Sequence, residues 1–151
     1  MRASQRVLLF VFPAVALASA DLIVKATVPT AWWAFHHRSD AWVALCLVVL
    51  VAMVALQLVP SGAVALAAGV TSGGVLGNLL SARMNGNRVP NPLVIDGSSY
   101  SLAFNLADVF FLVGNLLLLT SLVLLTVRNR GRLAPPRAWE RALLRPFRLG
   151  G

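Results

Sequence analysis

Long apolar stretches separated by short polar segments make up most of this chain. They cover about residues 7–29, 41–59, 63–82 and 102–127. About 20 mostly apolar residues in a helix are enough to cross the hydrocarbon core of a bilayer, so each stretch predicts one transmembrane helix. We therefore expect an all-α membrane protein, in which four transmembrane helices form one domain over residues 1–127, with a short extracytoplasmic loop or hairpin.

Composition and charge agree with a membrane protein. Of the 151 residues, 58% are hydrophobic and 12% are charged, whereas soluble domains carry charge on about a quarter of their residues. A net charge of +8 suggests a protein that binds nucleic acid, but most arginines lie before the first stretch or in the tail at 128–151. Because positive residues stay on the cytoplasmic side, we expect cytoplasmic termini, outward loops at 30–40 and 83–101, and no nucleic-acid partner. The basic cytoplasmic tail would meet anionic membrane lipids.

Two segments leave a choice open. The first 20 residues have the basic start, apolar core and Ala18-Ser19-Ala20 ending of a secretory signal peptide. The apolar character continues through Ile23, so we expect this segment to remain as the first helix, and its cleavage is the alternative. Within the tail, residues 137–148 predict either an amphipathic helix on the membrane surface or a disordered basic segment.

Polar side chains occur inside or beside three of the four stretches. Asp21 and Lys25 lie four residues apart, in the acid-first order that favours an ion pair on a helix. Asn78 lies at the end of the third stretch, and Asn105 and Asp108 lie at the start of the fourth. Because polar groups are costly in a dry setting without partners, we expect these side chains to face the interior. The third stretch also repeats a glycine every four residues, which allows close helix packing: Gly69, Gly73 and Gly77.

The few carboxylates gather on one side of the predicted membrane. The chain has five acidic residues, and Asp96 in the outer loop is twelve positions before Asp108. Two neighbouring carboxylates share a single proton, which lets one take a proton from water while the other donates, as in aspartic proteases. Neither H-E-x-x-H nor G-x-S-x-G is present, and no serine is clearly placed to pair with Lys25. We therefore expect neither a metal nor a cofactor.

The start of the last stretch carries the most specific motif. "FNLADVFFLVG" resembles the F-N-x-A-D motif of the lipoprotein signal peptidases (signal peptidase II), a family of four-helix membrane aspartic proteases. "LVID", which ends at Asp96, resembles the V-V-D segment of that family, and "SGGVLGNL" resembles its G-A-x-G-N-L motif. Asp21 and Lys25 resemble its D-x-x-x-K pair. The order of these motifs and their side of the membrane agree with the family up to about residue 127.

The resemblance implies a reaction and a role for each matching residue. Asp96 and Asp108 would be the catalytic pair of an aspartic-type endopeptidase that activates water directly. It would cleave diacylglyceryl-modified prolipoproteins before the lipid-bearing cysteine, near the outer face of the plasma membrane. The supporting residues would be Asn105, Asn78, Asp21, Lys25 and Arg83, with Arg83 or Arg88 meeting the lipid phosphate.

Departures from the family pattern keep two other functions open. "GNL" is followed by "LSARMNG" instead of I-D-R, the first outer loop lacks N-x-G-A-A-F, and the segment between Asp96 and Asn105 is short. These differences favour a divergent or reduced member, and a catalytically inactive relative that binds lipidated or membrane proteins is the alternative. A transport or proton-relay subunit ranks last, because the ionisable residues gather at one end of the helices instead of along the membrane depth.

Overall fold

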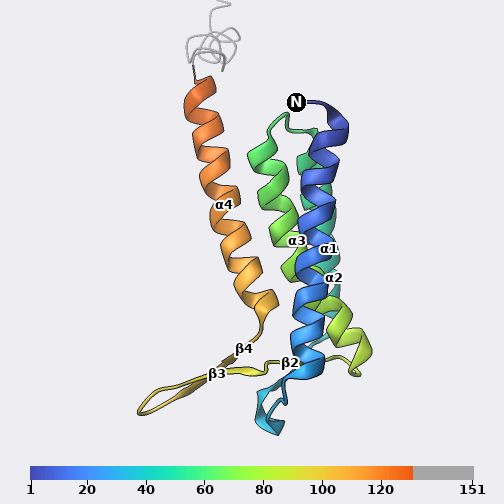
Figure 1. Ribbon diagram of the computed structural model, residues 1–151, viewed down its shortest axis with the longest axis vertical. Helices are drawn as coiled ribbons and strands as arrows, with labels where there is room; N and C mark the ends of the chain where they lie inside the picture. Colours follow the sequence, from blue (N-terminus) through green and yellow to red (C-terminus); the bar gives the residue numbers. More distant parts are fainter. Residues whose placement is uncertain (131–151) are drawn as a thin grey trace, which may run out of the picture.

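Four helices form the body of the protein in a computed structural model, which describes residues 1–130 (Figure 1). They are α1 (Ala3–Thr27), α2 (Asp40–Ala55), α3 (Gly62–Met84) and α4 (Leu106–Asn129). All four are long and apolar enough to cross a membrane, with α2 continued by the short helix η2 (Leu56–Leu58). The predicted number and order of helices are therefore confirmed. The tail, with its two predicted forms, lies outside the described residues.

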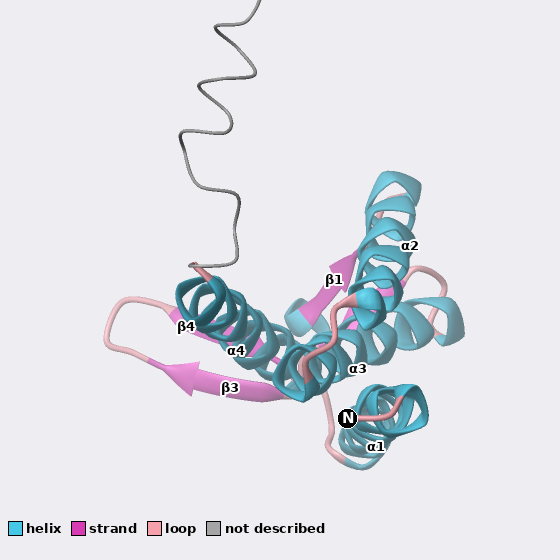
Figure 2. Cartoon of the chain, turned by 90° about the horizontal axis from the view of Figure 1, so that it is seen from above, coloured by secondary structure: helices cyan, strands magenta, loops and turns pink. Residues whose placement is uncertain are grey.

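Short strands gather at one end of the four helices, which we call the strand end. Strand β1 (Phe35–His37) follows the short helix η1 (Trp32–Ala34) and pairs antiparallel with β2 (Arg88–Pro90). Strand β3 (Leu93–Asp96) pairs antiparallel with β4 (Ser101–Phe104). This second pair is a hairpin that extends sideways from the helices (Figures 1 and 2). The N-terminus and the last turn of α4 lie at the opposite end (Figure 1).

The fourth helix begins four residues later than the apolar pattern predicted. We expected it from residue 102, but residues 101–104 are paired with β3 and Asn105 is the N-cap of α4. An apolar run of this kind fits a strand as well as a helix, and strand pairing decided the outcome. The first helix ends at Thr27 instead of residue 29, because Val28 precedes a proline and takes an extended backbone conformation.

Helix α3 lies between the other helices when the molecule is viewed along its axis (Figure 2). In the most apolar 18-residue segment of α3, 67% of the residues are buried, whereas in α2 and in α4 the share is 11%. Glycines make this central position possible. A Cβ atom at Gly73 would lie 2.9 Å from Leu17 Cβ of α1, and one at Gly74 would lie 2.5 Å from the Ala107 carbonyl oxygen of α4. The predicted close packing at glycine is therefore confirmed.

Candidate functional site

A line of polar side chains crosses the protein near the strand end and links three helices. The ammonium group of Lys25 on α1 forms an ion pair with Asp21 at 2.6 Å and donates to Asn78 Oδ1 of α3 at 2.8 Å. The Asn78 amide then donates to Asp108 Oδ1 of α4 at 2.9 Å. These contacts bring together four residues that the sequence had singled out, and we call them, with Asn105, the polar network.

Asp21 contacts both Lys25 and the start of α4. Its side chain is fully buried, and its Oδ1 accepts a hydrogen bond from the backbone N–H of Ala107 at 2.9 Å. The first N–H groups of a helix have no partner within the helix and favour negative charge. Gly77 of α3 leaves room for this carboxylate, since a Cβ atom there would lie 2.7 Å from Asp21 Oδ2. Asp21 thus fixes α1, α3 and α4 against one another.

Asn105 and Asp108 cap α4 reciprocally. The Asn105 side chain accepts from the Asp108 backbone N–H at 3.0 Å, and Asp108 Oδ2 accepts from the Asn105 backbone N–H at 3.3 Å. This arrangement is a capping box, which satisfies two donors at the start of a helix. With Asn78 on its other oxygen, Asp108 has a hydrogen-bond donor at each carboxylate oxygen. The residue is therefore held in one orientation by uncharged groups.

Asn91, which the sequence did not single out, extends the network beyond Asn105. Its Oδ1 accepts from the Asn105 side-chain amide at 2.6 Å, and its own amide contacts the Ala103 carbonyl oxygen at 3.1 Å and His36 Nδ1 at 3.0 Å. Only 2% of Asn91 is exposed. The imidazole can accept this amide N–H in the tautomer that has its hydrogen on Nε2. Asn91 lies between two prolines, and no pattern in the sequence distinguished it from a loop residue.

Asp96 lies away from the polar network. It pairs with Ser101 in the hairpin, where its Oδ1 accepts from the Ser101 hydroxyl at 2.7 Å, and it is exposed. The pair Leu93–Phe104 begins the hairpin, so Asp96 is three residues further out, or about 10 Å along a strand. Within residues 1–130 Asp96 forms no hydrogen bond with Asp108. The structure thus does not bring the predicted carboxylate pair together.

Arg83 is the other predicted site residue that the structure leaves outside the polar network. It is exposed in the last turn of α3, and within residues 1–130 its side chain has neither a hydrogen bond nor an ion pair. Arg38, just before α2, lines the same cavity as Asp108, and its guanidinium lies 5.0 Å from the centre of the Trp42 ring. No pattern in the sequence pointed to Arg38, because it is a lone arginine in an outer loop and belongs to none of the motifs.

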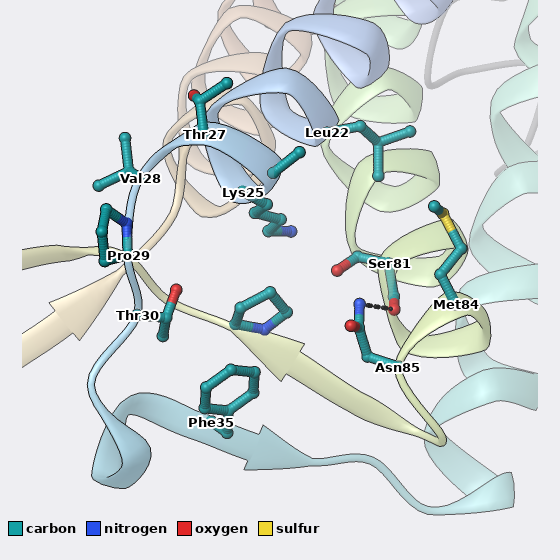
Figure 3. Close-up of a pocket in the computed structure, with 12 residues that line it drawn as sticks. Leu22, Lys25, Thr27, Val28, Pro29, Thr30, Phe35, Ser81, Met84 and Asn85 are labelled. Carbon is teal, nitrogen blue, oxygen red and sulfur yellow. Dashed lines mark hydrogen bonds between the residues drawn. The ribbon is translucent and has the colours of Figure 1, made fainter.

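Two cavities flank the polar network. The first, which we call the Arg38 cavity, has a volume of about 220 Å³ between α2, α3 and α4, and is lined by Arg38, Trp42, Val49, Asn78, Asp108 and Phe111 among others. The second, which we call the Lys25 cavity, has a volume of about 430 Å³ and is bordered by α1, α3, β1 and β2 (Figure 3). Lys25 borders one cavity and its partner Asn78 borders the other.

Residues 1–130 hold no group of three or more histidine, cysteine or acidic residues able to hold a metal ion. A comparison with family models, with curated proteins and with solved structures finds no match for the chain. The polar network, the two cavities and the sequence motifs are therefore the features that bear on its function.

Proposed function

We propose that this protein is a membrane-embedded relative of the lipoprotein signal peptidases that binds lipid-modified polypeptides without cleaving them. The observation that carries the proposal is the surroundings of Asp108. Its two oxygens accept from uncharged groups, and the buried side chain beyond Asn105 is the amide of Asn91. An aspartic protease needs two carboxylates that share one proton, and an amide cannot supply the second one.

The membrane location rests on the four apolar helices and on the distribution of charge. Large apolar side chains are exposed along α2 and α4, for example Val51 at 70% and Leu119 at 63%, which is favourable in lipid and costly in water. The basic residues at both ends of the chain favour cytoplasmic termini. The strand end, with the polar network and both cavities, then faces the outside of the plasma membrane.

The Arg38 cavity supplies a binding site suited to an acylated polypeptide. Its walls toward the middle of the helices are apolar, with Val49 of α2 and Phe111 of α4, and they could contact part of a lipid chain. Its polar end holds Arg38, whose buried Nε–H has no hydrogen-bond partner among residues 1–130. A carbonyl of the attached polypeptide would satisfy this donor, which is otherwise costly to leave unpaired. Binding would thus combine burial of the lipid with one or two directed hydrogen bonds.

A binding assay with a synthetic lipopeptide tests this proposal. A fluorescent peptide that carries a diacylglyceryl cysteine is expected to bind the purified protein in nanodiscs and to remain intact, while the same peptide without lipid is not retained. Val49→Trp should fill the cavity and keep part of the lipid from being buried there. Binding should weaken at least about tenfold, the effect of losing the burial of roughly two methylene groups. Val51→Trp is the matched control, because Val51 lies on the same helix and faces outward. Equal binding by both variants would contradict the proposal.

One observation favours the aspartic endopeptidase as a second candidate. The hairpin that carries Asp96 joins α4 directly and makes few contacts with the helices, so a hinge movement near Asn105 would carry Asp96 toward Asp108. Cleavage of a diacylglyceryl-modified prolipoprotein by the wild-type protein, abolished by both Asp96→Asn and Asp108→Asn, would establish this activity. That result would overturn the binding function proposed above.

A further inference from the structure

The Lys25 cavity is a second site, separate from the one that the proposed function uses. It opens at the strand end, where the link after α1, the sheet of β1 and β2, and the last turns of α3 meet. Figure 3 shows the side chains that border it. The polar network lies between this cavity and the Arg38 cavity. Lys25 lines the first, Asn78 lines the second, and the two side chains are hydrogen-bonded to each other.

Two buried side chains that border this cavity can each donate a further hydrogen bond. The Lys25 ammonium has three N–H groups, and two of them are used by Asp21 and Asn78. The Ser81 hydroxyl has no hydrogen-bond partner among residues 1–130, although only 2% of the residue is exposed. In Figure 3 the Lys25 nitrogen and the Ser81 hydroxyl point toward the same space, and the dashed line joins Asn85 to the Ser81 carbonyl oxygen instead.

The charges around these donors select an uncharged ligand. Lys25 is already paired with the carboxylate of Asp21, and Asn78 connects it to a second carboxylate, Asp108. An anion would therefore meet a positive charge that is already neutralised, next to two negative groups. A carbonyl oxygen has two lone pairs and no charge, so one such oxygen can accept from both Lys25 and Ser81.

The walls and the position of the cavity indicate the source of this carbonyl. Apolar side chains form much of its surface, with Leu22, Phe35 and Met84 among them. Lys25 is two residues before the end of α1, so in a bilayer-spanning helix it lies where the hydrocarbon core meets the head groups. Ester carbonyls of glycerolipids lie at this depth. We propose that the Lys25 cavity binds a membrane glycerolipid through one ester carbonyl, held by Lys25 and Ser81.

Native mass spectrometry with two matched lipids tests this site without any polypeptide. Dioleoylphosphatidylcholine carries ester carbonyls, and its diether analogue lacks them but keeps the same head group and chain length. We expect the protein to retain the ester lipid about fivefold better, which is the effect of roughly one net hydrogen bond. Ser81→Ala should lower the preference for the ester lipid, because only Lys25 then donates to the ester carbonyl.

Ser72→Ala is the control, because Ser72 is a buried serine of α3 whose hydroxyl also lacks a partner but does not border the cavity. It should keep the ester preference, as should Val49→Trp, which separates this result from the fate of the Arg38 cavity. Equal retention of the two lipids by the wild-type protein, or an unchanged preference in Ser81→Ala, would overturn the proposal.

Discussion

The ion pair between Asp21 and Lys25 is the most deeply buried charged contact among residues 1–130, and Asp21→Asn tests its contribution to stability. The two side chains are 0% and 4% exposed, and their charged atoms are 2.6 Å apart. Asparagine keeps an oxygen that can accept from the Ala107 N–H, so the helix contact survives. The change therefore removes a charge with little change in shape, and it leaves the Lys25 ammonium buried without a counter-charge.

The expected cost follows from that unpaired charge. Removing one partner of a buried ion pair lowers the free energy of unfolding by about 3–5 kcal/mol. Removing both charges with Asp21→Asn and Lys25→Met should cost less, about 1–2 kcal/mol, because the remaining loss is the donor to Asn78. The double variant should therefore be more stable than the single Asp21→Asn variant, although it carries one more substitution.

Unfolding by sodium dodecyl sulfate in mixed micelles, followed by tryptophan fluorescence, measures these free energies for wild-type, both single variants and the double variant. Asp40→Asn serves as the control, because Asp40 is exposed at the start of α2 and has no ion pair among residues 1–130. It should change stability far less than Asp21→Asn. Additive effects of the two single substitutions would refute the view that the ammonium is costly because it has lost its partner.

Three further predictions concern packing and the polar network. Gly74→Ala should lower the free energy of unfolding by about 1–3 kcal/mol in the same assay, because its Cβ would meet α4 backbone. Gly62→Ala should be nearly neutral, because its Cβ would meet only the movable side-chain ends of Met1 and Leu9. Asn105→Ala should cost about 1–2 kcal/mol through the lost cap, and more than Asn115→Ala, whose side chain bonds only within its own helix; equal costs would contradict the role of the capping box. Asp96→Asn should leave the unfolding midpoint unchanged, since its hydrogen bond is exposed, and a clear shift would show that the hairpin packs more tightly.

Local patterns in the sequence predicted the elements and several of their contacts. Apolar length predicted the four helices, and the i,i+4 spacing of Asp21 and Lys25 predicted their ion pair, because a helix fixes the distance between such positions. The outer segment was expected as a short loop or hairpin, and the structure has the hairpin of β3 and β4. These features depend on residues that are neighbours along the chain, and a sequence shows such neighbours directly.

Contacts between distant segments were decided only by the tertiary structure. The eleven residues between Asp96 and Asp108 set an upper limit on the separation of the two carboxylates. Pairing of β3 with β4 used that length to extend a hairpin and carried Asp96 outward. The same arrangement buried Asn91 beside Asn105. A sequence states how far apart two side chains can be, and only strand register and helix packing determine how far apart they are, because those contacts join residues that the chain itself does not hold together.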